Sequence, residues 1–141
     1  MDVYTAYLNG DLQETVLMQQ SDNFIDPLSP KKVLKLNKAI YGLKQAGREW
    51  NAKLDHALKA DGFSPCLSEI CLYRKCTDDV IILVAVYVDD IILASKSMEH
   101  INLIKKTLCS SFECVDKGSL RHFIGMNIER NDRLGEISIN T

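Results

Sequence analysis

The most constraining feature of the sequence is an apolar run from Val80 to Val88 that stops at two adjacent aspartates and then resumes. Asp89 and Asp90 form this doublet, and Ile91 to Ala94 continue the apolar pattern. Because the run shows no alternation of polar and apolar residues, it predicts a strand buried on both faces of a sheet. The doublet is therefore either an ordinary hairpin turn or a pair of carboxylates held for chemistry.

A second aspartate pair provides an internal comparison. Asp78 and Asp79 also lie in a predicted turn, but they follow Arg74 and Lys75 and are expected to be solvated. The doublet at positions 89 and 90 instead directly follows the most apolar predicted strand of the chain. Adjacent carboxylates in that setting repel each other unless cations compensate them, and Mg²⁺ suits carboxylate oxygens.

Asp2 is a third acidic residue at the start of an apolar-rich segment. If that segment lies beside the strand that ends at Asp89, the two side chains can converge at one position of a sheet. Such an arrangement can hold two metal ions about 3.5–4 Å apart. The sequence thus indicates a divalent metal site, and the convergence itself depends on the fold.

Two segments have helical periodicity. The first is expected to end near Gly62, and its apolar residues recur at spacings of three and four: Leu43, Ala46, Trp50, Leu54 and Ala57. Trp50 is interpreted as a core residue of this stripe. The second is expected to begin after an N-cap at Ser97 and to direct three residues inward: Ile101, Ile104 and Leu108.

Strand-forming segments surround the helices, and they predict the fold class. Residues 2–8 are rich in β-branched and aromatic side chains and are expected to form a strand that turns at Asn9–Asp11. Residues 71–94 predict a three-stranded meander, and residues 120–128 and 136–139 predict a hairpin. The expected fold is α+β, a largely antiparallel sheet with two helices on one face, in one domain over residues 1–141.

Composition and charge exclude two classes of protein. Seventeen Lys and Arg against nineteen Asp and Glu give a net charge of −2, which excludes a strongly basic, self-sufficient nucleic-acid binder. The longest apolar run is interrupted by aspartates and is too short for a spanning helix, which excludes a membrane protein. The absence of a secretory signal predicts an intracellular protein, cytoplasmic or nuclear, with five free thiols.

Four sequence blocks occur in an order that is specific to one family. They are MDVYTAYLNGDL (1–12), YGLKQAGREW (41–50), YVDD (87–90) and FIGMNIER (123–130). In this order the chain resembles the reverse transcriptase of copia-type LTR retrotransposon Pol polyproteins, over essentially its whole length. The resemblance implies a truncated polymerase palm and an RNA-directed DNA polymerase activity.

The resemblance implies roles for the three aspartates. Asp2 matches the first catalytic aspartate of the family, and Asp89 and Asp90 match the pair at the hairpin tip. Together they resemble the triad that binds two Mg²⁺ ions, or Mn²⁺, in polymerase palms. The implied reaction is attack of a primer 3′-hydroxyl on the α-phosphate of a deoxynucleoside triphosphate, on an RNA or DNA template.

Further binding residues are implied by the same blocks. Tyr7 matches the aromatic residue that packs under the incoming sugar and excludes a ribose 2′-hydroxyl, and a core aromatic is the alternative interpretation, with which that role is compatible. Gln45 matches a glutamine near the nucleotide and template, and it could also be an exposed residue at a helix end. Phe123, Ile124 and Gly125 resemble the primer grip, or else a plain sheet edge.

Departures from the family pattern define the alternatives. Gly47 stands where the family usually has proline, and the fingers, thumb and ribonuclease H are not in this sequence. Asp2 is expected to fray because it lies near a terminus. We therefore expect the chain alone to be inactive. The alternatives are a non-enzymatic remnant or domesticated module that binds a partner, and a different two-metal phosphotransferase such as a nucleotide cyclase.

Overall fold

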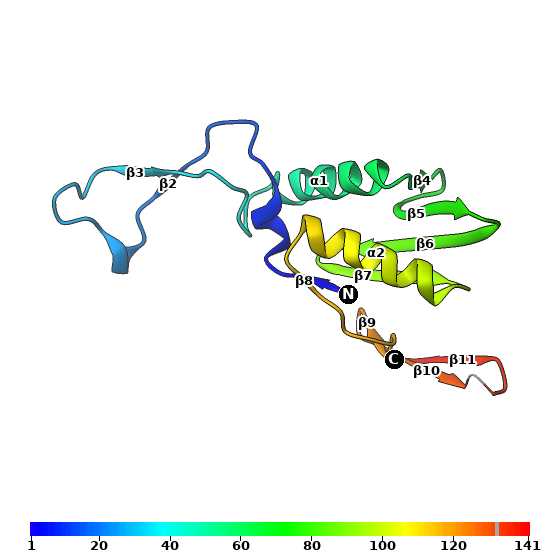
Figure 1. The fold of residues 1–141 in the computed structure, drawn as a ribbon. Coiled ribbons are helices and arrows are strands. Elements are labelled where there is room, and N and C mark those ends of the chain that lie inside the picture. The colour runs from blue at the N-terminus through cyan, green and yellow to red at the C-terminus, as the bar shows by residue number, and fades with distance from the viewer. Residues whose placement is uncertain (132) are drawn as a thin grey trace.

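The computed structural model describes residues 1–131 and 133–141. The largest element of this part of the chain is a six-stranded antiparallel sheet in the order β4-β5-β6-β7-β1-β8 (Figure 1). The strands β5, β6 and β7 form the predicted meander. The bounds of the six strands are Ser64–Cys66 (β4), Glu69–Thr77 (β5), Val80–Tyr87 (β6), Asp90–Ser95 (β7), Asp2–Val3 (β1) and Cys114–Val115 (β8).

The two predicted helices are present as α1 (Ala46–Ala60) and α2 (Met98–Ser111). The N-cap prediction is confirmed, because the Ser97 side chain accepts a hydrogen bond of 3.3 Å from the backbone N–H of His100. Gly62 follows the end of α1 with a φ of 86°, a conformation that glycine adopts without steric cost. In the described part of the chain, neither helix is long and apolar enough to cross a membrane.

One face of the large sheet carries the core. The buried residues of the strands alternate along the chain, and both helices direct their apolar stripes into the same cluster, as predicted. The sheet contributes Val3, Tyr73, Ile82, Val84, Val86 and Ile91, and the helices contribute Trp50, Leu54, Leu58, Ile104 and Leu108. The opposite face of the sheet is therefore left without a covering layer of helices.

The prediction that β6 is buried on both faces is wrong. Ile81 is 62% exposed and Tyr87 is 52% exposed, whereas Ile82, Val84 and Val86 are buried. The apolar run misled the prediction because an antiparallel sheet covered by helices on one side can still carry apolar residues on its open side. The aspartate doublet follows β6 in the sequence and leads into β7, at one end of this open face.

The expected strand over residues 2–8 is much shorter in the structure. β1 ends at Val3, Thr5 takes a left-handed conformation with a φ of 48°, and a 3₁₀ helix, η1, covers Ala6–Asn9. A β-carbon on Gly10 would lie 3.0 Å from the backbone nitrogen of Trp50. The chain leaves the sheet early because this close approach brings η1 onto α1 and buries Ala6 completely.

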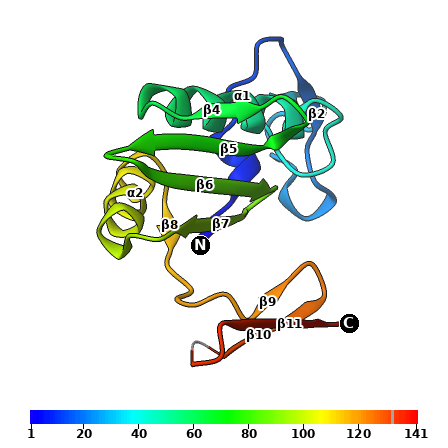
Figure 2. The same cartoon turned by 90° about the vertical axis from the view of Figure 1, so that its right-hand side faces the viewer.

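Two smaller sheets project from the body. Strands β2 (Leu17–Gln19) and β3 (Val33–Lys35) form an arm that also carries the 3₁₀ helix η2 (Asp22–Phe24) (Figure 1). The carboxyl-terminal sheet has the order β11-β10-β9 and lies below the large sheet (Figure 2). Its strands are β9 (His122–Phe123), β10 (Met126–Asn131) and β11 (Glu136–Asn140).

The predicted hairpin of the carboxyl-terminal region is confirmed in its second half only. β10 pairs with β11, but residues 120–128 do not form one continuous strand. Ile124 and Gly125 both have positive φ, at 48° and 76°, and make a two-residue turn between β9 and β10. The apolar neighbours of Gly125 predict a continuous strand, and the turn breaks it because glycine adopts positive φ without steric cost.

Candidate functional site

The aspartate doublet lies at the turn between β6 and β7. Tyr87 pairs with Asp90 across the hairpin, so that Val88 and Asp89 form the two-residue connection. Val88 has a φ of 53°, which is a strained conformation for a β-branched residue. The hairpin tip predicted from the sequence is present. Its backbone at Val88 lies outside the negative-φ regions that most residues adopt.

Asp2 lies beside this hairpin because β1 is paired on both edges. Asp2 is opposite Asp90 in β7 and opposite Val115 in β8. The backbone N–H of Val3 donates to the carbonyl of Asp89 at 2.9 Å. The expected fraying of Asp2 is therefore wrong, since β7 and β8 hold β1 from both sides.

The pleat places the paired carboxylates on the open face of the sheet. Val3 and Ile91, which follow Asp2 and Asp90, are buried in the core on the other face. The side chain of Asp2 is 20% exposed, and Asp90 is partly exposed as well. The register thus sets Asp2 opposite Asp90, and Asp89 directly precedes Asp90 in the β6–β7 turn.

Lys117 supplies positive charge to these carboxylates. Its Nζ atom lies 2.5 Å from Oδ2 of Asp2. The hydrogen bond to Asp2 raises the pKa of Lys117, and the charges of Asp90 and Asp89 act in the same direction. Sequence reasoning missed Lys117, because its place follows from the pairing of β8 with β1, which joins segments more than 100 residues apart.

The donor set suits a hard divalent cation. Three carboxylates supply the oxygen ligands that Mg²⁺ and Mn²⁺ prefer, and two of them face each other across adjacent strands. Within residues 1–131 and 133–141, however, no group of three or more His, Cys, Asp or Glu side chains is already arranged to hold a metal ion. The cation that Asp2 contacts is the Lys117 ammonium. All five cysteines are free thiols.

Tyr7 forms an aromatic pair near the carboxylates. It lies in η1, and its ring centroid is 4.3 Å from that of Tyr41. Burial raises the pKa of the Tyr41 phenol, and the charges of Asp89 and Asp2 add to the shift. Tyr41 therefore lies within the electrostatic reach of the carboxylates, although it was not singled out from the sequence block that contains it.

Gln45 is placed directly before α1, and its amide is already paired. Its Nε2 atom donates to Oε1 of Glu14 at 2.9 Å, at the base of the β2–β3 arm. Gly47 lies in the first turn of α1, where an added β-carbon would lie 3.8 Å from the Tyr7 hydroxyl. A side chain larger than that of glycine would therefore fit at this position without a steric clash at its β-carbon.

The three residues of the predicted primer grip lie at the β9–β10 turn. Phe123 makes an edge-to-face contact with Tyr87, with 6.3 Å between ring centroids. Tyr87 in turn pairs with Asp90. The contact brings the turn formed by Ile124 and Gly125 to the open face of the sheet, next to the β6–β7 hairpin.

Trp50 is a core residue as predicted, and it also reaches the carboxylate turn. Its side chain is 2% exposed and packs edge-to-face on Phe112, with ring centroids 5.1 Å apart. Its indole Nε1 donates to the carbonyl oxygen of Val88 at 2.6 Å. The hydrogen bond joins α1 to the turn that carries Asp89, a link that helical periodicity alone does not reveal.

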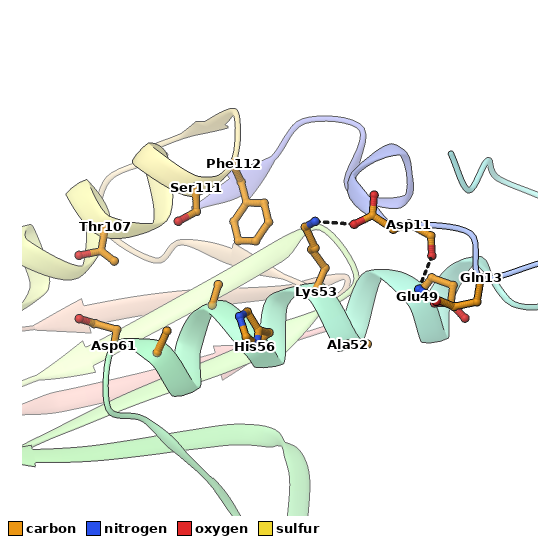
Figure 3. A pocket seen from close by; sticks show the side chains of 12 residues that line it. Asp11, Gln13, Glu49, Ala52, Lys53, His56, Asp61, Thr107, Ser111 and Phe112 are labelled. Atoms are coloured by element: carbon orange, nitrogen blue, oxygen red, sulfur yellow. Dashed lines mark hydrogen bonds and ion pairs between the residues drawn. The ribbon is translucent and has the colours of Figure 1, made fainter. Parts of the chain in front are cut away.

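A pocket of about 570 Å³ lies elsewhere, between α1 and the end of α2 (Figure 3). Lys53 points across it to the Asp11 carboxylate, and Phe112 and His56 contribute to its lining. None of the residues predicted for the site lines this pocket. The carboxylates occupy the open face of the sheet, which suits a large substrate better than an enclosed small molecule.

Comparison with known proteins identifies the family to which this chain is similar. Residues 1–140 match the family model described as reverse transcriptase (RNA-dependent DNA polymerase). The chain is 37% identical over 131 residues to a retrovirus-related Pol polyprotein from transposon TNT 1-94 of Nicotiana tabacum. It is 35% identical over 139 residues to a putative Ty5-1 transposon protein of Saccharomyces cerevisiae, and 35% identical over 130 residues to the RE1 transposon Pol polyprotein of Arabidopsis thaliana.

These alignments cover 92%, 99% and 92% of this chain. They cover only 10%, 45% and 9% of the respective relatives, so the chain spans less than half of each relative's length. No solved structure matches it. The family match favours the polymerase interpretation over the nucleotide cyclase. The chain belongs to the reverse transcriptase (RNA-dependent DNA polymerase) family, in the group found in Pol polyproteins of copia-type retrotransposons.

Proposed function

We propose that this chain forms the carboxylate-bearing palm of an RNA-directed DNA polymerase, with Asp2, Asp89 and Asp90 as metal ligands. The observation that carries the proposal is the register of β1 and β7, which sets Asp2 opposite Asp90 at the turn that contains Asp89. Mg²⁺ is the expected ion and Mn²⁺ the alternative, because all three ligands are carboxylates.

The proposed reaction joins a primer 3′-hydroxyl to the α-phosphate of a deoxynucleoside triphosphate, and pyrophosphate leaves. Two divalent ions, when bound, would lower the pKa of the hydroxyl and stabilise charge on the phosphate oxygens. The aspartates would hold these cations, and the Lys117 ammonium, which now pairs with Asp2, would have to leave that carboxylate to make room for them. An RNA or DNA template with its primer is the proposed partner.

The remaining residues are proposed to bind and orient the substrates. Tyr7, braced by the ring of Tyr41, supports the sugar of the incoming nucleotide. Gln45 would leave Glu14 to contact the nucleotide or template. The turn of Phe123, Ile124 and Gly125 holds the primer end, and its contact with Tyr87 supports a place beside the carboxylates.

We also propose that the chain does not extend primers alone. Its net charge is −2, so its own basic residues attract a phosphate backbone weakly. Polymerase activity then needs cationic surface that these residues do not provide. The need for added cationic surface also distinguishes the polymerase from the alternative, a remnant that binds a partner, because such a remnant needs no nucleic acid.

A chimera tests the proposal. We would replace the matching segment of the tobacco relative's polyprotein with this chain and measure dNTP incorporation on a primed RNA template with Mg²⁺. The chimera is expected to extend the primer, its Asp89→Asn variant to lose extension, and the chain alone to be inactive. A chimera that is active regardless of Asp89 would rule out the proposed role of the aspartates. Extension by the chain alone would disprove only the claim of inactivity.

A further inference from the structure

We propose that Trp50 is a positioning residue for the aspartate doublet: its indole N–H, donated to the Val88 carbonyl, holds the β6–β7 turn so that Asp90 stays opposite Asp2. The inference rests on the proposed function of these aspartates as metal ligands. It adds a group that touches neither metal nor substrate and acts through the backbone.

The hydrogen bond is short, and its donor is buried while Val88 at the accepting end is partly exposed. Nε1 of Trp50 lies 2.6 Å from the Val88 oxygen, and the Trp50 side chain is 2% exposed. An indole has a single donor and no acceptor, so this carbonyl is its one partner. Because a buried donor without a partner costs free energy, the indole and the turn restrain each other.

The turn needs a restraint because its backbone is strained. Val88 has a φ of 53°, although β-branched residues strongly disfavour positive φ. The turn of the other hairpin of the meander has two residues with positive φ, Asp78 and Asp79, and aspartate tolerates this region far better than valine. Strain of this kind persists only where the surroundings over-determine the conformation.

The indole and the helix that carries it are each packed against another segment. Phe112, at the end of α2, packs against the indole edge-to-face. Gly10 passes so close to α1 that an added β-carbon would lie 3.0 Å from the backbone nitrogen of Trp50. The indole of α1 therefore contacts the end of α2 on one side. Through one hydrogen bond it also contacts the turn that carries Asp89.

The single tryptophan of the sequence allows an isosteric test. Biosynthetic replacement of tryptophan by benzothienylalanine exchanges the indole N–H for sulfur at position 50 alone and keeps the ring shape. The Trp50→Phe variant removes the N–H by ordinary mutagenesis. Leu54→Ala is the matched control, because Leu54 lies on the same buried stripe of α1 and has no hydrogen bond to the turn.

Two readouts are measured on the 141-residue chain: Mn²⁺ affinity, and the backbone amide shifts and hydrogen exchange of residues 87–91. Loss of the indole N–H is expected to weaken Mn²⁺ binding by about ten- to hundredfold, as for other groups that orient metal ligands. Turn amides are expected to exchange faster while the centre of β6 is unchanged. The Leu54→Ala control is expected to lower Tm with little change in Mn²⁺ affinity.

The outcomes separate the two proposals. Mn²⁺ affinity and turn amides that are unchanged in the benzothienylalanine protein would overturn the positioning role of Trp50. An equal loss of affinity in Leu54→Ala would also overturn it, because the effect would then reflect general destabilisation. If Asp89→Asn leaves Mn²⁺ binding of the unaltered chain intact, the proposed function itself fails, and the inference fails with it.

Discussion

Asp2 of β1 lies directly opposite Asp90 of β7, so that two carboxylates face each other across adjacent antiparallel strands. Like charges in this position destabilise a sheet. Lys117 compensates one of them through its ion pair with Asp2. Two facing carboxylates on the open face concentrate negative charge there. This position of the sheet therefore favours the binding of cations.

The first prediction concerns the repulsion between the two carboxylates. In the absence of divalent metal, Asp90→Asn should raise the free energy of unfolding by up to about 1 kcal/mol, because one of two facing charges is removed. The same variant should lose the rise in Tm that Mn²⁺ gives the unaltered chain. Urea denaturation and thermal melts, each with and without Mn²⁺, measure both effects.

Asp79→Asn is the control for this prediction, since Asp79 lies in the other hairpin turn of the meander. It should leave the Mn²⁺-dependent stabilisation unchanged. An equal Mn²⁺ response in Asp90→Asn would show that the ion binds away from the proposed site.

The second prediction concerns Lys117. Because its ammonium pairs with the Asp2 carboxylate, Lys117→Gln should tighten Mn²⁺ binding several-fold and should lower metal-free stability by up to about 1 kcal/mol, since the charge that offsets the facing carboxylates is lost. Calorimetric titration measures the affinity. Lys59→Gln, which removes an ion pair with Asp55 on α1, should not alter it. Weaker Mn²⁺ binding in Lys117→Gln would mean that Lys117 supports the ion instead of competing with it.

The third prediction compares two glycines that contact the same region. Gly10→Ala should lower the free energy of unfolding by about 1–3 kcal/mol, because the new β-carbon would press on the backbone of Glu49 and Trp50 at 3.0–3.1 Å. Gly47→Ala should instead be neutral or stabilising by up to about 1 kcal/mol, since its β-carbon meets only the Tyr7 hydroxyl at 3.8 Å. Urea denaturation of both variants provides the measurement, and a stable Gly10→Ala protein would contradict the close packing of η1 on α1.

The fourth prediction concerns acid stability. Hydrogen bonds from Lys38 and Lys53 lower the pKa of Asp11 to about 2 from its ordinary value of 3.8. The contribution of Asp11 to stability is therefore complete above pH 4 and is lost as the pH falls from 4 towards 2. Urea midpoints between pH 6 and pH 2 should fall less steeply for Asp11→Asn than for the unaltered chain. Identical slopes would show that the two lysines do not restrain Asp11 in solution.

Local sequence features predicted the secondary structure of the body well. The apolar stripe through Trp50 and Leu54 predicted α1, and Ser97 predicted the start of α2, because both signals depend on neighbours within a few residues. The hairpin tip at Asp89 followed from an interruption in an apolar run. The same local reasoning failed at Thr5, Ile124 and Gly125, where positive φ values end strands whose composition favours extension.

Part of the geometry of the candidate site could be predicted from the sequence. Asp2 and the doublet were proposed as metal ligands from their setting and from the family resemblance, and the register of β1 and β7 sets Asp2 opposite Asp90. Lys117 and the hydrogen-bonding role of Trp50 were not identified. Both depend on contacts between segments distant in sequence, for which composition and spacing carry no signal.

The amino-acid sequence by itself determined the two amphipathic helices, the meander and the identity of the three carboxylates, because periodicity and adjacency are encoded within short stretches of chain. Only the tertiary structure decided that Asp2 faces Asp90, that one side of β6 stays open, and that Trp50 donates a hydrogen bond to the Val88 carbonyl. The physical reason is that strand register and burial are set by packing between distant segments, and a shift of one residue in β1 would turn Asp2 into the core.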